Sequence, residues 1–526
     1  MSKSKVLKRI LPVMMADSGV TYYVDATSGD DANTGLTSGA PWKSIDKVAA
    51  ASLNPGDKVL FKRGEVWRSR LRLTCSGSAG KHIVFGAYGT GDKPILSGAE
   101  LLSSWNDEGG NIWNAALNPE CLVVWFDEDM GTKVANKPAL AANDDWFWDT
   151  NVLYIYSDSD PGDKVIEGSN EWQCIDQNEL SYLRFENLKV EKSRGGNIRI
   201  DGDATDIIIS NVDCAKAFQE GIYVGVAGGA AVTPSNVVIE DCTVTLCNRE
   251  DQIATPAIHQ WLGTSGGDNL VIRNCTISSD IDVVNSGFAR DGIMVDDGDN
   301  VLIENNSISD FDHGIQMRGS LVDAKDVDTF VIRYNRIEVF DDAIWLNGTD
   351  EADSEIYYNL LVNTGDQHFD IIGEGGKIYN NTCYGGQSNA IALQNDASSK
   401  VVFKNNIISH HANNKVIVNI DDTAGVDIAN STFDNNCYYR AAPSVDFWDY
   451  DGGGGGNFAD WQSTHSMDAN GINENPLYTA FGTDFTLQAG SGCRDAGVDV
   501  GLTRDYPGES VPQETSPAIG AYEYTG

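Results

Sequence analysis

The chain has 526 residues with 37 basic and 77 acidic side chains, which gives a net charge of −40. Its length supplies enough apolar material for a large core, and its acidity argues against nucleic acid or an anionic membrane as a partner, because both attract clustered Lys and Arg. The sequence contains no stretch that is long and apolar enough to predict membrane insertion.

Residues 1–19 differ from the rest of the chain. Four basic residues precede a short apolar run at 10–16, which Pro12 interrupts. The run is short for a secretory signal. We therefore expect residues 1–19 to be either a signal peptide or a peptide that attaches the protein to a larger particle.

Residues 20–104 are expected to form an N-terminal cap and the first coils of a repeat structure. Residues 22–24 are apolar enough for a strand, and Ser44 is suited to cap a short helix at 45–52. A helix across the open end of a stack of coils covers strand edges that would otherwise pair with other molecules.

Residues 105–175 interrupt the repeat with an aromatic-rich segment. Short runs of alternating apolar residues separated by polar turns predict a small inserted β-subdomain. Its rings would either form the core of the subdomain or stack on sugars. The aromatic residues include Trp113, Trp125, Trp146, Trp148, Tyr154 and Tyr156.

Residues 176–445 contain the repeat itself, in which apolar positions alternate and lead to an Asn or Asp at the fifth position. The fifth positions are Asn187, Asn211, Asp241, Asn274, Asn305, Tyr334, Asn359, Asn381, Asn405 and Asn430. They recur at intervals of about 22–33 residues, which is typical of a solenoid. Each unit is too short for a helix and alternates like a strand. The pattern predicts an all-β fold, a right-handed single-stranded parallel β-helix, with the fifth positions stacked as an internal amide ladder.

A second strand recurs between these units, as in GIMVDD and GIQMRG, and its outward positions should stack in columns. The columns gather carboxylates, a histidine and an arginine between about residues 259 and 347, where the longest loops also fall. The candidate catalytic residues are Asp291, His313, Arg318 and Asp342. The candidate substrate-binding residues are His259, Gln316, Trp345, Asn347 and Gln394.

Two reactions suit this patch. Hydrolysis of a glycosidic bond needs a protonated and an ionised carboxyl group, and Asp291 and Asp342 are expected about 9–10 Å apart with His313 between them. A lyase needs a base, here His313, and a cation that neutralises a uronate. Arg318 would supply that charge, together with Ca²⁺ held by Asp296, Asp297 and Asp299.

Residues 446–526 lose the repeat. A glycine run at 452–456 predicts a crossover, a short helix follows, and the last part is expected to cap the C-terminal end.

Several segments resemble carbohydrate-active β-helix proteins, a group of pectin-type hydrolases, polysaccharide lyases, uronan epimerases and phage tailspikes. FDDAIWL, with Asp341 and Asp342, is similar to the paired-Asp strand of the pectin hydrolases, and RDGIMV is similar to their preceding Asp strand. GIQMRG is similar to the Arg-bearing strand of alginate and chondroitin lyases, although Asp296 stands where those enzymes carry a Lys. The Gly-His-Gly and Arg-x-Lys elements of the hydrolases and the Asp-Pro-His signature of the epimerases are absent.

The resemblance implies a polysaccharide-degrading enzyme that is extracellular or virion-associated and cleaves an acidic glycan. Hydrolysis is favoured over β-elimination by a lyase. A non-catalytic glycan-binding tailspike or adhesin is the alternative from another class. The tailspike resemblance would also imply a homotrimer or attachment to a virion.

Overall fold

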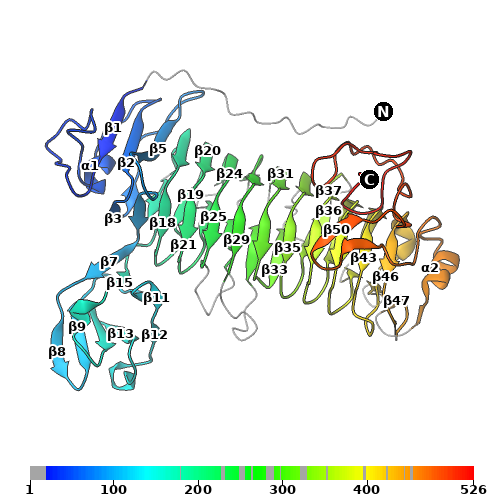
Figure 1. Cartoon of the computed structure of the whole chain (residues 1–526). Helices are drawn as coiled ribbons and strands as arrows, with labels where there is room; N and C mark the ends of the chain where they lie inside the picture. The colour runs from blue at the N-terminus through cyan, green and yellow to red at the C-terminus, as the bar shows by residue number, and fades with distance from the viewer. Residues whose placement is uncertain are drawn as a thin grey trace. The chain divides into compact units, whose positions relative to one another are not determined.

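The computed structural model describes residues 19–526 except 178, 227–231, 248–254, 262–264, 280–289, 297, 320–328, 351–352, 395–398, 422–424, 444 and 451–453. It divides the chain into two compact units, Met1–Ala230 with Asp241–His259, and Ala231–Glu240 with Gln260–Gly526. Both are built from coils of parallel strands, which confirms the predicted parallel β-helix (Figure 1). No helix among the described residues is long and apolar enough to cross a membrane.

The second unit stacks its strands in three parallel series. The first, here called the site face, contains β30 (Asp291–Val295), β33 (His313–Arg318), β36 (Ile344–Asp350), β39 (Phe369–Tyr379), β41 (Ile391–Leu393), β44 (Val418–Ile420) and β47 (Trp448–Tyr450). The second contains β24 (Ser235–Glu240), β28 (Val271–Arg273), β31 (Asp299–Glu304), β34 (Thr329–Arg333), β37 (Glu355–Tyr357), the end of β39, β42 (Lys400–Lys404) and β45 (Thr432–Asp434). The third contains β29 (Thr276–Ser278), β32 (Ser307–Ser309), β35 (Arg336–Glu338), β38 (Leu360–Val362), β40 (Thr382–Tyr384), β43 (Ile407–Ser409) and β46 (Cys437–Tyr439). β23 (Val232–Thr233) and β27 (Ser265–Gly266) form a separate pair.

Alternation along each strand fills the interior of the coils. On β33, the side chains of Ile315 and Met317 are fully buried, and on β36 those of Ile344 and Leu346 are fully buried. The residues between them therefore face away from the core, and successive coils align these outward residues in columns.

A ladder of buried asparagines runs through the second unit. Its members are Asn306, Asn335, Asn359, Asn381, Asn406 and Asn436. Each side-chain amide donates to the Oδ1 of the next, over 2.9 to 3.3 Å. The last amide donates to Asp468 at 2.8 Å, and Asp468 also accepts from Tyr438 and Trp461. The ladder thus ends on a carboxylate, which only accepts.

The predicted ladder was wrong by one residue for several coils. Asn305 is exposed and adopts a left-handed backbone with φ 56°, and its amide donates to Asn274, which is also exposed. Asn359 and Asn381 do lie inside, whereas Asn430 lies in the 3₁₀ helix η4 (Ile428–Asn430). The repeat often places two polar or turn-forming residues together, the first forming the bend and the second entering the core.

The C-terminal segment packs back onto the coils of the second unit. Helix α2 (Phe458–Thr464) begins with a capping box between Asn457 and Asp460. The hairpin of β49 (Tyr478–Ala480) and β50 (Asp484–Leu487) and the residues 518–521 share a core with Tyr357 and Ile407. Figure 1 shows this segment in orange and red beside β37 and β43.

The first unit begins with the predicted cap. Ser44 caps α1 (Ile45–Ala49), a shorter helix than expected, and accepts a hydrogen bond from the backbone of Lys47. The unit contains β1 (Thr21–Val24), β2 (Lys58–Lys62), β3 (Val66–Arg68), β4 (Leu71–Arg72), β5 (Ile83–Tyr88), β6 (Ile95–Ser97), β16 (Ile175–Asp176), β17 (Leu183–Glu186), β18 (Lys189–Glu191), β19 (Ile198–Asp201), β20 (Thr205–Ser210), β21 (Asp213–Ala215), β22 (Ile222–Gly225) and β25 (Thr243–Thr245). β26 (Ile258–Gln260) contains the boundary between the units, because His259 belongs to the first unit and Gln260 to the second.

Two small sheets lie between β6 and β16 in sequence. One contains β7 (Ala99–Leu102), β10 (Val124–Phe126), β11 (Asp129–Met130) and β15 (Ile166–Ser169). The other contains β8 (Asn106–Gly109), β9 (Ile112–Ala116), β12 (Thr132–Lys133), β13 (Asp145–Asp149) and β14 (Val152–Tyr156). A short 3₁₀ turn, η1 (Lys137–Ala139), lies between β12 and β13, and a second, η2 (Pro161–Asp163), follows β14. Trp146 lies in their shared core, with Trp113 and Trp148 packed against it. These indoles therefore stabilise the subdomain.

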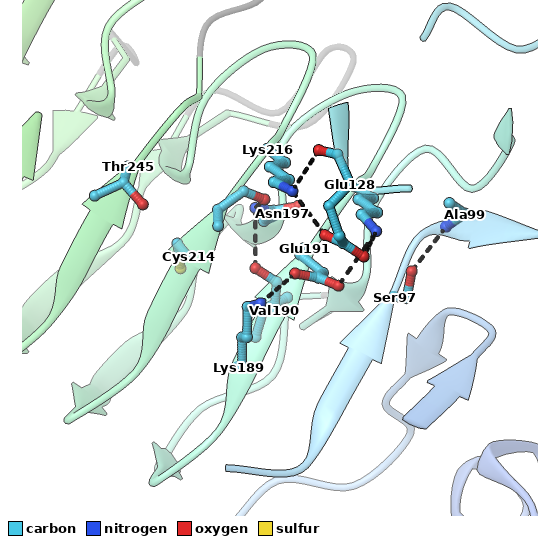
Figure 2. A network of polar contacts seen from close by, with 12 residues as sticks. Ser97, Ala99, Glu128, Lys189, Val190, Glu191, Asn197, Cys214, Lys216 and Thr245 are labelled. Atoms are coloured by element: carbon cyan, nitrogen blue, oxygen red, sulfur yellow. Dashed lines mark hydrogen bonds and ion pairs between the residues drawn. The ribbon is translucent and has the colours of Figure 1, made fainter. Parts of the chain in front are cut away.

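An ionic network, buried at Lys192 and Glu167 and exposed at Glu128, joins this subdomain to the coils of the first unit (Figure 2). Glu128, in the turn before β11, lies 2.7 Å from the Nζ atoms of both Lys192 and Lys216. Burial alone would raise the pKa of Glu128, but the two ammonium groups lower it to about 2. Lys192 is almost fully buried and also binds Glu167. Because Lys192 and Glu167 are both buried, an uncharged replacement of either one would weaken the pairing of the other buried charge.

Candidate active site

The outward column at the start of the site-face strands is formed as the repeat predicts. Asp291 lies opposite His313 in the β30–β33 register. Ile315 lies opposite Ile344 in the β33–β36 register, which places Asp342 opposite His313 on the other side. Adjacent coils are about 4.8 Å apart, so His313 lies between two carboxyl groups.

His313 is nearly buried and bound on both sides of its ring. Its Nδ1 lies 2.8 Å from Oδ1 of Asp291, and its Nε2 lies 3.5 Å from Asp341 and 3.9 Å from Asp342. Burial disfavours the imidazolium, but the hydrogen bonds with Asp291 and Asp341 and the charges of Asp291 and Asp342 outweigh it and raise the pKa of His313 to about 11. His313 is therefore a cation at neutral pH and cannot act as a base there.

Asp342 is the complementary case, a carboxyl group held neutral. It is 6% exposed. Burial, followed by the charges of Asp370 and Asp341, raises its pKa to about 8 against the lowering effect of His313. Its Oδ1 accepts a hydrogen bond from the backbone of Gln367 at 3.0 Å. A buried carboxyl group that keeps its proton at neutral pH is suited to general acid catalysis.

Asp370 lies one coil further, opposite Trp345 in the β36–β39 register. Its Oδ1 accepts a 2.6 Å hydrogen bond from Nε2 of Gln394. Burial raises its pKa to about 6, and the bond from Gln394 limits the rise. Sequence reasoning missed Asp370 because its strand, HFDII, begins with His-Phe and not with the small residue and Ile of the neighbouring strands.

More carboxyl groups surround this centre. Asp366 follows Asp341 by one coil, its backbone N–H donating to the carbonyl of Asp341. Burial raises the pKa of both Asp366 and Asp312. Asp312 accepts from the backbone of Arg290, a buried residue whose charge also faces it.

Arg318 occupies a second outward column and is bound to the protein itself. Its Nη2 donates to Asp296 Oδ2 at 2.9 Å, and its Nε lies 2.7 Å from Oδ1 of the same carboxylate. Its guanidinium also lies 5.9 Å from the ring centre of Trp261. Asp296 therefore occupies the Nε–Nη2 edge of the guanidinium, one of the two edges that could bind a uronate in a bidentate way.

The predicted substrate-binding residues separate into two groups. Gln316, Trp345 and Asn347 lie on the site face, and the Trp345 ring lies 4.9 Å from that of His313. Gln394 joins them through Asp370. His259 belongs to the first unit, where it lies 3.5 Å from Glu220 and packs on Tyr223.

The calcium site expected at Asp296, Asp297 and Asp299 stays a prediction. Asp296 is bound by Arg318, the backbone N–H of Asp299 donates to Asp268, and Asp297 lies outside the described residues. A different set, His313, Asp341 and Asp342, brings ligand atoms within 4.8 Å of one another, close enough for one metal ion. Asp291 behind His313 would orient such a ligand.

A hollow of about 560 Å³ lies away from this cluster, between the strand ends of β34 and β37 and residues 501–508. Its Arg333 binds Glu304 and the hydroxyl of Tyr357. Because that charge is already satisfied, the perturbed acids of the site face are the better candidates for chemistry.

Comparisons with known proteins agree with the fold. The family described as "Right handed beta helix region" matches residues 173–320 and 257–465. The chain belongs to this right-handed beta helix family. It resembles the structure described as the complex of XylC with xylose, with a TM-score of 0.66 and 15% identity over 96% of this chain and 99% of the other. A structure described as a glycoside hydrolase gives a TM-score of 0.50 and 10% identity over 82% and 95%.

One curated relative shares sequence locally. A lacto-N-biosidase of Bifidobacterium longum is 40% identical over 105 residues, which cover 18% of this chain and 7% of the relative. The chain therefore matches a small part of that protein.

Proposed function

We propose that the protein is a glycoside hydrolase in which Asp342 is the general acid and Asp370 is its ionised partner. The observation that carries the proposal is the pairing of two buried carboxyl groups with pKa values of about 8 and about 6. Near pH 7, Asp342 keeps its proton while Asp370 has lost its own. Environments that push two carboxyl pKa values apart assign the acid and the base or nucleophile.

His313 would position and polarise the acid. As a cation held by Asp291, it faces both Asp341 and Asp342. Its charge stabilises the ionised form of Asp342 after the proton has moved to the leaving oxygen, while burial stabilises the protonated form before transfer. Asp291, expected at the sequence level as one of the two catalytic acids, becomes a positioning residue in this arrangement.

The charge of the site face favours a neutral glycan over the acidic one expected from resemblance. The cationic groups described at the cluster are Arg290, His313 and Arg318, and each faces a carboxylate of the protein. The cluster also contains the carboxyl groups of Asp341, Asp366 and Asp370, so carboxyl groups outnumber these cations. A uronate would be brought against this negative field, whereas an uncharged sugar would meet hydrogen-bond acceptors.

The comparisons support this class of substrate. One similar structure contains xylose, an uncharged sugar, another is described as a glycoside hydrolase, and the partial relative is named a lacto-N-biosidase. Polysaccharides lie outside cells, so we place the protein in an extracellular or virion-associated setting.

A second candidate rests on the metal-ligand geometry of His313, Asp341 and Asp342. A divalent cation there would neutralise the carboxylates and admit a uronate, which is the requirement of a lyase. This reading needs His313 to release its proton to bind the metal.

The deciding experiment is incubation with neutral and acidic polysaccharides, with and without EDTA and added Ca²⁺. New reducing ends on neutral chains, without an unsaturated ultraviolet-absorbing product and without a metal requirement, support the hydrolase. An unsaturated product that EDTA abolishes supports the lyase. Binding without either product identifies a glycan-binding spike or adhesin and overturns both enzymatic proposals.

A further inference from the structure

The indole of Trp261 is an exposed side chain held in a fixed place. It is 42% exposed, although large apolar side chains are costly to leave in water. The backbone N–H of Asp296 donates to the carbonyl of Gln260. In a parallel ladder this bond sets the register of the two coils, and it places Asp296 opposite Trp261 on the next coil. The residue after Asp296 in the same column is Arg318.

Arg318 reaches back along this column to Trp261. Its guanidinium lies 5.9 Å from the indole centre, while Asp296 is 2% exposed and binds the guanidinium at two points. Fixing an arginine by two bonds restricts the side chain, and the cation then restricts the ring. The outcome is an exposed aromatic ring whose orientation is set before any ligand arrives, which lowers the entropy lost on binding.

The position of Trp261 relates it to the proposed acid. Asp296 and Arg318 lie on the two coils between Trp261 and the coil of Asp342, so the indole is three coils away, about 14 Å along the axis. Trp345, half-buried beside His313, lies on the coil of Asp342 itself. One ring thus lies at the carboxyl centre and a second at a distance that only a chain of several sugars can span.

We infer that Trp261 is the platform of a distal subsite, where it stacks on the apolar face of a pyranose ring of a neutral oligosaccharide. The inference rests on the proposed function for the place of the scissile bond. Arg318 is then a positioning residue for Trp261, which differs from the catalytic role expected from the sequence. The site takes oligosaccharides or polysaccharides in preference to disaccharides.

The test measures binding as a function of chain length. Neutral oligosaccharides of two to about six sugars, from xylan, glucan, mannan and lacto-N series, are titrated calorimetrically into an Asp342→Asn background, which prevents turnover. We expect affinity to rise with length, and Trp261→Ala to weaken binding of the longest chain about tenfold while changing that of the disaccharide less than about twofold. Trp261→Phe should restore most of the loss, and Arg318→Lys should give an intermediate one.

Trp172→Ala is a matched control. Trp172 is 39% exposed, and the Arg194 guanidinium lies 5.3 Å from its ring, but it belongs to the first unit. Its variant should leave the length dependence unchanged.

Equal affinity of Trp261→Ala and its background for every length overturns the inference, as does a background that binds no chain more tightly than the disaccharide. The two proposals fail separately. Length-dependent binding that Trp261→Ala removes, in a protein that hydrolyses nothing, keeps the platform and rejects the hydrolase. Hydrolysis that requires Asp342 but shows no length effect keeps the hydrolase and rejects the platform.

Discussion

The Nδ1 atom of His313 lies 2.8 Å from Oδ1 of Asp291 on the preceding coil, and the opposite edge of the ring faces Asp341 and Asp342. Asp291 is 2% exposed. The arrangement fixes the ring and keeps its proton, since a buried carboxylate favours the charged imidazole. The pair thus supplies the positive charge closest to the proposed acid.

The first prediction follows from this pair. Asp291→Asn removes the charge that holds the His313 proton, so the His313 pKa should fall, and loss of the imidazolium should raise the pKa of Asp342. We expect turnover to fall at least about tenfold and the alkaline limb of the pH–rate profile to move upward. The measurement is kcat against pH for both proteins. An unchanged alkaline limb would show that His313 does not tune the acid.

The pH dependence of the wild type is the second prediction. Activity should rise as pH increases through about 6, where Asp370 loses its proton, and fall through about 8, where Asp342 loses its own. The limbs belong to the coupled pair. Asp370→Asn should abolish most activity, with rescue by azide if Asp370 is a nucleophile, whereas Gln394→Ala should move the acidic limb upward. A profile that is flat between pH 5 and pH 9 contradicts the assignment.

The third prediction separates activity from stability at Asp342. Its folded pKa of about 8 lies above its unfolded value, so the folded state binds the proton more tightly and stability falls as pH rises from about 4 toward 8. The Asn side chain does not ionise, so its burial does not become less favourable as pH rises. Asp342→Asn should lower turnover at least about a hundredfold, yet raise the free energy of unfolding at pH 7 by on the order of 2–4 kcal/mol.

Urea unfolding at pH 5 and pH 7.5 checks this result, because the gain should be larger at the higher pH. Ser309→Ala, on another strand series, is a control that should alter neither rate nor pH dependence. A variant that is less stable than the wild type at both pH values would show that Asp342 is ionised in the folded protein.

Sequence reasoning predicted the coils, the outward column and the neighbours of His313, because strand period and repeat interval determine which residues align. It did not predict pKa values, which depend on burial from other coils. It missed Asp370 because Phe369 replaces the Ile that marks the neighbouring strands. It assigned the charge of Arg318 to a substrate uronate, although the aligned strands already place Asp296 one coil away; the structure shows that Asp296 binds the guanidinium.

The ladder gives the fourth prediction. Asn359 is fully buried, donates to Ile332 and Asn381, and accepts from the backbone and side chain of Asn335. Asn359→Ala leaves several of these groups without partners and should lower the free energy of unfolding by about 3 kcal/mol. Asn305→Ala, on the exposed bend, should cost less than about 1 kcal/mol. Chemical denaturation measures both, and equal losses would contradict the assignment of inside and outside.

The last prediction concerns a pair of buried histidines in the second unit. The rings of His368 and His411 lie 5.8 Å apart, and His368 is fully buried. Burial lowers the pKa of His368 to about 3, and the neighbouring His411 lowers it further. Burial lowers the pKa of His411 to about 4, and the charge of Arg440 acts in the same direction. A β-carbon on Gly386 would lie 2.7 Å from His411 and 2.8 Å from His368, so little room exists to hydrate a charged ring.

Both folded pKa values lie below the unfolded value of about 6.5, so the pair contributes stability above that pH and the contribution is lost as pH falls toward 4. We expect the protein to unfold steeply in this range. His411→Gln should reduce the loss of unfolding free energy between pH 7 and pH 4.5. Because each protein is compared with itself at the two pH values, the structural cost of the substitution cancels. His410→Gln, at a half-buried neighbour, should reduce it less. If His411→Gln and the wild type lose equal stability over this interval, protonation of the buried pair does not drive acid unfolding.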